Sequence, residues 1–119
     1  NGFFLSKQAE KTLTEKGIHC RVVDLRWLAP LDEKGIIEHA QACQKILIVD
    51  ECRKTGSISE AIMSLLTENV DKQSGDVQRI CAQDSFIPLG SAAYHVLPSK
   101  DDIVNVASKM CSSVTQKQA

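Results

Sequence analysis

The chain of 119 residues is long enough for one domain with an unassisted core. Its 43% hydrophobic and 24% charged residues, with a formal charge of −1, are typical of a globular protein and indicate no polyanion partner. With one Trp, one Tyr and no aliphatic run longer than Ile46–Val49, we expect neither nucleic-acid binding nor a membrane span, which needs ~20 apolar residues.

The first part of the chain predicts two helices with a strand between them. Apolar residues four positions apart predict a surface helix over residues 5–16, ended by Gly17. The sequence CRVVDLRWL (20–28) is rich in β-branched and aliphatic residues and predicts a strand. Asp32 is placed to cap the next helix by accepting a backbone N–H bond, and the apolar face of that helix continues to Cys43.

The middle of the chain contains the clearest strand. KILIVDE (45–51) has four consecutive apolar residues, which a parallel strand needs when helices cover both its faces. Ser57 and Glu60 match the capping box, so each side chain is expected to satisfy an N–H at the start of the next helix. That helix is predicted to end near Asn69, and a further strand is predicted over 77–82.

The last part is predicted to be an irregular connection followed by a helix. Residues 83–98 contain two prolines and a glycine, with one short helix expected around 92–96. The closing helix is expected to start after Ser99, where Asp101 and Asp102 suit the positive end of the helix dipole.

Helices alternating with strands predict an α/β fold, with a mostly parallel sheet covered on both sides. We expect one domain over 1–119. The alternation begins on a helix and leaves three strands, so we also expect the domain to be truncated at its N-terminus. A strand just before Asn1 would complete it.

Polar residues at the ends of strands are the first candidates for chemistry, since ligands of open α/β sheets bind there. These residues are Asp24, Asp50, Glu51, Cys52 and Asp84. They could hold a metal or transfer protons, but no histidine follows them at ligand spacing, and acids commonly cap the helices that leave such strands. Structural roles are the favoured interpretation.

Two further candidates have weak signals. Gly56 before a helix could hold a phosphate or carboxylate, but both phosphate-loop motifs are missing, and a structural turn is favoured. The cationic neighbours of Cys52 would lower the pKa of its thiol and so activate it, whereas its acidic neighbours would act in the opposite direction. The five cysteines are odd in number and form no C-x-x-C pair, so we expect reduced thiols and a cytoplasmic or mitochondrial-matrix location.

Three ordered stretches resemble a known family. VVDLRWLAPLD (22–32), ILIVDECRKTGSISEAI (46–62) and VQRICAQDSFIPLGSAAYHVLPSKDDIV (77–104) are similar to the C-terminal transketolase-like domain of thiamine-diphosphate enzymes. The likeness is closest to the beta subunit, or beta half, of the decarboxylating component of pyruvate or 2-oxoisovalerate dehydrogenases. It spans nearly the whole chain.

This resemblance implies a three-layer α/β/α domain with a mixed five-stranded sheet, of which two strands precede Asn1. The parent enzyme would decarboxylate a 2-oxoacid and transfer the acyl group to lipoyl, with thiamine diphosphate and Mg held by its other domains. No catalytic, cofactor-binding or metal-binding residue is then expected in this chain. The domain would pack subunits in a homodimer or heterotetramer, and offer a surface to the acyltransferase core's peripheral-subunit-binding domain.

The resemblance carries over to few residues, and we assign them structural or interface roles. They are Asp24, Arg26, Pro30, Leu31, Asp32, Glu51, Gly56, Glu60, Asp84 and Pro88. The chain departs from the family at Ser59, where a glycine is frequent, and at Ala93-Tyr94, where a leucine-glutamate pair is frequent.

Two other classes of binding module stay open. ILIVDE resembles the acidic first strand of a phospho-receiver domain. That fold would need a phosphoacceptor Asp at a later strand end and a lysine strand after it, whereas Asp101 and Asp102 are expected to start a helix. A flavodoxin-like module would need a phosphate loop that the sequence lacks.

Overall fold

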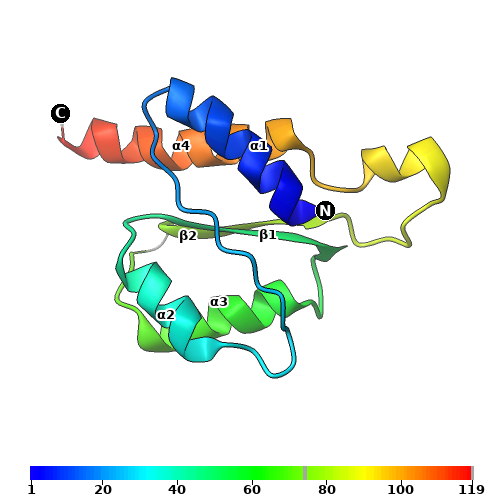
Figure 1. Ribbon diagram of the computed structural model, residues 1–119, viewed down its shortest axis with the longest axis horizontal. Coiled ribbons are helices and arrows are strands. Elements are labelled where there is room, and N and C mark those ends of the chain that lie inside the picture. The colour runs from blue at the N-terminus through cyan, green and yellow to red at the C-terminus, as the bar shows by residue number, and fades with distance from the viewer. Residues whose placement is uncertain (74, 119) are drawn as a thin grey trace.

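The computed structural model describes residues 1–73 and 75–118. Its elements in chain order are α1 (Gly2–Glu15), α2 (Glu33–Gln41), β1 (Ile46–Arg53), α3 (Ile58–Asn69), β2 (Val77–Ala82), the 3₁₀ helix η1 (Gly90–His95) and α4 (Lys100–Gln118). Figure 1 shows three layers, with β1 and β2 between the pair α1 and α4 and the pair α2 and α3. The two strands are parallel. The predicted α/β/α architecture is confirmed.

Strand β1 is apolar on both faces because a pair of helices covers each face. Ile46 and Ile48 pack into the core beneath α2 and α3. Leu47 and Val49 pack into the core beneath α1 and α4. Successive side chains of a strand point to opposite faces, so four apolar residues in a row are what a strand between two helix layers requires.

The helices bury the faces that their periodicity predicts. The core beneath α2 and α3 contains Ile36, Ala40, Ile62, Leu66 and Val70. The core beneath α1 and α4 contains Ala9, Leu13, Ile103 and Val104. None of the helices in the described part of the chain is both long and apolar enough to cross a bilayer.

The prediction of a strand over 20–28 is wrong. Residues 18–27 belong to no helix or strand, and the nearest pairing is an isolated bridge between Leu28 and Leu31. A strand needs a neighbour that shares its backbone hydrogen bonds. This segment passes in front of β1 without pairing with it (Figure 1), so the sheet of the described residues has two strands rather than three.

Helix ends follow their predicted signals in two places. Gly17 lies in the left-handed region at φ +81°, and the N–H of Ile18 returns to the carbonyl of Leu13 at 2.9 Å, which ends α1. At the start of α4, the N–H of Asp102 donates to Ser99 Oγ at 3.1 Å, and Asp102 Oδ2 accepts from the N–H of Ser99 at 2.9 Å. This is a complete capping box.

Helix α2 begins at the predicted cap, Asp32, and its first turn contains a glycine, which lowers the helix propensity. Asp32 Oδ1 accepts from the N–H of Gly35 at 3.0 Å. A Cβ atom at Gly35 would overlap the Asp32 carboxylate. Glycine weakens a helix interior, but at this position it makes room for the capping side chain.

We predict that Leu66→Ala lowers the free energy of unfolding by about 2–5 kcal/mol, because the truncation leaves a cavity in a close-packed core. The Leu66 side chain is 2% exposed. Urea denaturation followed by circular dichroism measures the change. Ser64→Ala, at an exposed position of the same helix, is the control and should change stability by less than about 0.5 kcal/mol. Equal effects of the two substitutions would contradict the packing.

Candidate functional site

A cluster of polar side chains lies where β1 and β2 end, and we call it the strand-end cluster: Asp50, Thr55, Ser59, Glu60, Arg79 and Asp84. Asp50 is 8% exposed. Its Oδ1 accepts from the N–H of Cys52 at 2.9 Å, and its Oδ2 accepts from the N–H of Ser59 at 3.1 Å. The carboxylate therefore joins the end of β1 to the first turn of α3.

These hydrogen bonds set the charge state of Asp50. Burial alone would raise its pKa, but the bonds from the backbone of Cys52 and from Ser59 favour the charged form, and they hold the pKa of this carboxyl below its ordinary value. A charged carboxylate also suits the positive end of the α3 dipole.

The predicted capping box at α3 is wrong. Ser57 makes no cap hydrogen bond, because its hydroxyl lies 2.7 Å from the hydroxyl of Ser59. The capping box would place the Glu60 carboxylate on the N–H of Ser57. Instead, Glu60 Oε2 accepts from the N–H of Gly56 at 2.9 Å. Asp50 supplies the cap instead. Gly56 is held at φ +70°, a region that glycine adopts without strain, as expected for a structural turn.

Arg79 ties the cluster to β2, and sequence reasoning missed it. One guanidinium nitrogen donates to the Lys54 carbonyl at 2.8 Å and to Ser59 Oγ at 3.1 Å. The other lies 3.5 Å from Glu60 Oε1. Ser59 itself is fully buried. A charged residue inside a mostly apolar strand was the signal in the sequence, since a buried charge needs partners.

Asp84 fixes the start of the connection after β2. It accepts from the N–H of Thr55 at 3.0 Å and from the Thr55 hydroxyl at 2.8 Å. These hydrogen bonds lower the pKa of the Asp84 carboxyl from its ordinary value. The turn after β1 and the chain leaving β2 are therefore held together.

The polar side chains of the strand-end cluster bond to groups of the same chain. The backbone N–H groups of Thr55, Gly56 and Ser59 all donate to carboxylates of the same chain, so they do not form an open anion cradle. The negative charge of Asp50 and partial burial raise the pKa of the Cys52 thiol, which makes it a poorer nucleophile. No group of three or more potential ligands is placed to hold a metal ion among residues 1–73 and 75–118.

The other predicted residues lie in three separate places. Asp24 and Arg26 form an exposed ion pair at 3.5 Å in the segment before α2, where Pro30 follows a cis peptide bond. Pro88 is exposed in the connection after β2. At the end of β1, Oε1 of Glu51 is buried with no hydrogen-bond partner among the described atoms.

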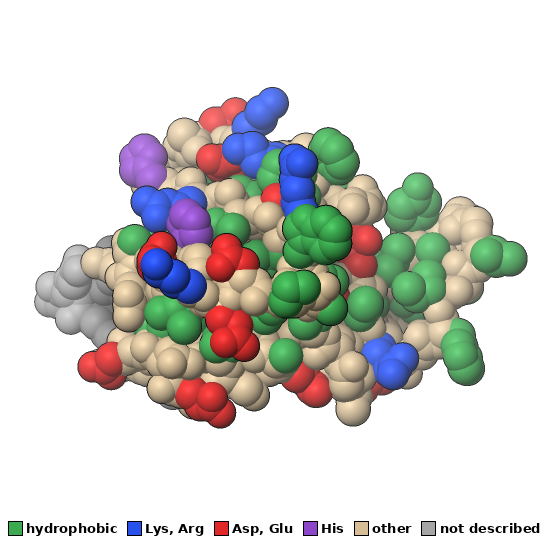
Figure 2. Space-filling view, turned by 60° about the horizontal axis from the view of Figure 1, so that its bottom comes forward, with side chains coloured by type: hydrophobic (Ala, Val, Ile, Leu, Met, Phe, Trp, Pro, Cys, Tyr) green, Lys and Arg blue, Asp and Glu red, His purple; other side chains and the backbone are tan. Residues whose placement is uncertain are grey.

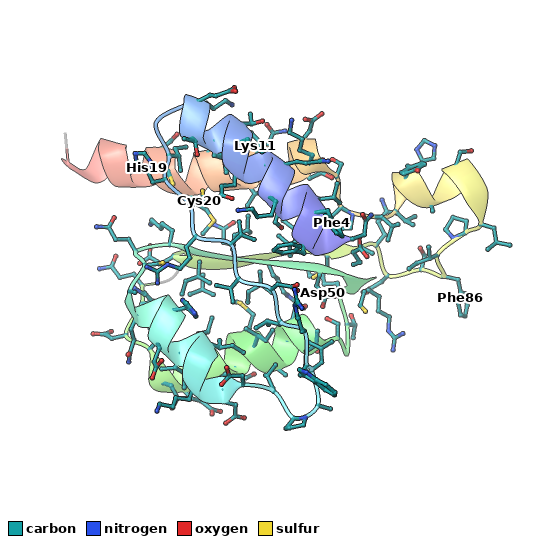
Figure 3. All side chains as sticks on the ribbon, viewed as in Figure 1. Phe4, Lys11, His19, Cys20, Asp50 and Phe86 are labelled. Carbon is teal, nitrogen blue, oxygen red and sulfur yellow. The ribbon has the colours of Figure 1, made fainter. Side chains whose placement is uncertain are left out.

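Residues 83–98 form an arm that projects from the body, and the sequence did not predict its exposure (Figure 1). The N–H of Gln83 donates to the carbonyl of Val96 at 3.1 Å and closes the base of the arm. Phe86 is fully exposed, Leu89 is 94% exposed and Tyr94 is 81% exposed. Figure 2 shows hydrophobic side chains gathered on this projection, and Figure 3 shows Phe86 far from Asp50.

Comparison with known proteins identifies the fold family. Residues 2–103 match the family described as "Transketolase, C-terminal domain". The chain belongs to this family. A transketolase C-terminal domain accounts for the layered α/β architecture and for the order of the three stretches quoted above. Neither the receiver nor the flavodoxin-like interpretation gains support from this match.

Relatives of this transketolase C-terminal domain come from several enzymes. The 1-deoxy-D-xylulose-5-phosphate synthase of Halothermothrix orenii is 30% identical over 108 residues, which cover 87% of this chain and 16% of that protein. The chloroplastic pyruvate dehydrogenase E1 component subunit beta-2 of Arabidopsis thaliana is 31% identical over 106 residues, with coverages of 87% and 26%. The 2-oxoisovalerate dehydrogenase subunit beta of Bacillus subtilis is 42% identical over 62 residues, with coverages of 52% and 19%. The chain thus spans about a quarter or less of each of these relatives.

We predict that Asp50→Asn destabilises the domain at pH 7 by about 1–3 kcal/mol, because the N–H groups of Cys52 and Ser59 lose a charged acceptor. The folded-state pKa of Asp50 is lowered. The stabilisation is therefore complete above the unfolded-state pKa of ~3.9 and is lost as the pH falls through the folded-state value.

Urea denaturation at pH 7 and at progressively more acidic pH measures this difference. The gap between the variant and the original chain should shrink below about pH 4, the ordinary carboxyl range. Asp71→Asn, at an exposed position, is the matched control and should leave stability unchanged. A gap that stayed constant with pH would show that the Asp50 charge contributes nothing.

Proposed function

We propose that this chain is the C-terminal assembly domain of a thiamine-diphosphate-dependent 2-oxoacid dehydrogenase, in the beta subunit or beta half of its decarboxylating component. The parent reaction is oxidative decarboxylation of a 2-oxoacid with acyl transfer to lipoyl. Family membership supports the enzyme class, and the relatives named as E1 and 2-oxoisovalerate subunits support the choice within it.

The polar groups of the domain do not fit the cofactor. Thiamine diphosphate and its Mg need free donors for the diphosphate and a set of oxygen ligands for the metal. In the strand-end cluster the backbone donors already bind Asp50, Glu60 and Asp84. We therefore assign cofactor binding to other domains of the parent and a supporting role to this one.

The main support for the assembly role is the exposed apolar surface of the arm. Phe86, Leu89 and Tyr94 expose large apolar surfaces on a projection whose base is fixed by Gln83 and Asp84. Large apolar side chains exposed together on one projection are typical of contacts with partners. Aromatic residues also dominate the binding energy of protein interfaces.

The proposed partners are other subunits or domains of the parent enzyme, in a homodimer or heterotetramer. The acyltransferase core's peripheral-subunit-binding domain is a further proposed partner. Among the predicted interface residues, Pro88 lies within the arm and Asp84 holds its base. Glu51, Gly56 and Glu60 lie at the strand ends beside it and support it indirectly.

A second enzyme class is supported by a specific likeness. The 1-deoxy-D-xylulose-5-phosphate synthase of Halothermothrix orenii is about as similar to this chain as the pyruvate dehydrogenase subunit of Arabidopsis thaliana. In that case the domain would support a synthase rather than a dehydrogenase. Assaying the complete polypeptide for each reaction distinguishes the two parents.

We predict that Phe86→Ser with Leu89→Ser weakens subunit association of the complete polypeptide at least tenfold, because apolar anchors at interface centres contribute about 2 kcal/mol or more each. Analytical ultracentrifugation over a concentration series measures the dissociation constant. Lys11→Ser changes an exposed side chain on α1, remote from the arm (Figure 3), and is the control. An unchanged dissociation constant in the double variant would remove the arm from the interface.

We also predict that the 119-residue chain alone does not turn over pyruvate or a branched-chain 2-oxoacid when supplied with thiamine diphosphate and Mg. The physical reason is that its carboxylates and N–H groups are bound to one another. Release of CO₂ from a carboxyl-labelled 2-oxoacid measures the reaction, and the complete polypeptide is the positive control. Decarboxylation by the isolated chain would contradict the assignment of a supporting role.

A further inference from the structure

A cysteine lies between helix α4 and the segment that follows α1. Cys20 belongs to residues 18–27, which form no helix or strand, and its side chain packs against the core that contains Ile103 and Val104 of α4. Ala107, one turn further along α4, packs against the same core. Figure 3 shows Cys20 beside α4. The Cys20 thiol therefore lies against the inner face of this helix.

A second cysteine lies on the same face of α4. Residues three and four positions apart are neighbours on a helix surface, so Cys111 continues the stripe of Ala107. Met110, next to it, is only 3% exposed, which places this turn of α4 against the body of the protein. Cys20 and Cys111 also line the same cavity, of about 740 Å³. Two thiols from distant parts of the chain thus face one common space.

The sulfur of Cys111 is close enough to Cys20 to affect its ionisation. Burial and the neighbouring Cys111 raise the pKa of the Cys20 thiol, and Glu10 and Cys43 add smaller effects in the same direction. Like charges that lie close together disfavour the charged form of each group. A disulfide between the two sulfurs carries no charge, so its formation removes this repulsion.

The other three cysteines are placed less favourably to react with Cys20. Cys43 follows α2, which covers the opposite face of the sheet, and it has a smaller effect on Cys20 than Cys111 has. Cys52 is exposed at the end of β1, and Cys81 lies within β2. All five cysteines are reduced in the structure. Cys111 is therefore the favoured partner.

We propose that Cys20 and Cys111 form a redox-sensitive dithiol site, which a low-molecular-weight disulfide such as glutathione disulfide converts to an intramolecular disulfide. One protein thiolate attacks the glutathione disulfide, forms a mixed disulfide and releases one glutathione. The second thiolate attacks the protein sulfur of the mixed disulfide and releases the other glutathione. Two protein thiols are oxidised, one glutathione disulfide is reduced, and the two thiol protons end on the two glutathione molecules.

The segment that carries Cys20 allows this bond to form. A disulfide requires Cα atoms roughly 4.4–6.8 Å apart. Helix α4 is regular around Cys111, whereas residues 18–27 lie outside helices and strands, so the segment is the part that adjusts. The bond would fasten this segment to α4 and so hold α1, from which the segment leads, against α4. The proposal is independent of the proposed function.

The test is to incubate the reduced chain with glutathione disulfide, unfold it in acid, alkylate the remaining thiols with iodoacetamide and digest it for mass spectrometry. The chain has five thiols and the reaction consumes two, so alkylation should fall from five sites to three. A disulfide-linked pair of peptides joining Cys20 to Cys111 should appear, and dithiothreitol should abolish it.

Variants with one cysteine replaced provide the controls. Neither Cys20→Ser nor Cys111→Ser should give an internal link, because each lacks one sulfur of the pair. Cys52→Ser, at an exposed position, is the matched control and should form the link as the original chain does. Oxidation of the chain in urea should give a mixture of links, because the fold no longer selects the pair.

Four results would overturn the proposal. Five alkylated sites after the incubation would show that the pair is not oxidised. A link from Cys20 to Cys43 would show that another thiol is the partner. Glutathione adducts without a link would show that the two sulfurs cannot meet. The same link at the same yield in urea would show that the fold does not bring them together.

Discussion

The structure depends on covering both faces of one apolar strand. Ile46 and Ile48 need a helix layer on one side, and Leu47 and Val49 need a layer on the other. Burial of apolar surface is the main favourable term in folding, so this strand fixes the order of the layers. The helix pairs α1 with α4 and α2 with α3 follow from it.

The polar groups at the end of this strand stabilise the junction between β1, β2 and α3 through hydrogen bonds within the chain. Asp50 caps α3, and Asp84 holds the turn at Thr55. Arg79 bonds to the turn after β1 and to residues of α3. Catalytic groups usually have unsatisfied or strongly perturbed positions in an open pocket. Here each carboxylate accepts hydrogen bonds from its own chain. The exposed apolar arm lies apart from this cluster (Figure 3).

Local patterns in the sequence predicted what depends on local physics. The apolar periodicity of α3, the four-residue run in β1 and the cap at Asp32 were correct, because helix faces and helix caps involve residues close in the chain. The capping box at Ser57 failed because Asp50, which is distant in sequence but adjacent in space, took its place.

Features that depend on distant partners could not be predicted in this way. The 20–28 segment has the composition of a strand, but pairing requires a neighbour that no local pattern supplies. The hydrogen bonds of Arg79 and the exposure of Phe86 likewise depend on how the chain packs in three dimensions. The resemblance to the family correctly indicated the α/β layers, while the roles of individual residues remain predictions.

The central claim is that this domain lends surface to a larger enzyme and holds no reactive centre. A structure of the complete polypeptide with thiamine diphosphate bound tests it most directly. The account predicts that Phe86 and Leu89 are buried against another domain or subunit, and that Asp50 and Glu60 make no contact with the cofactor. A cofactor held by those two carboxylates, or an arm that stays in solvent, would contradict it.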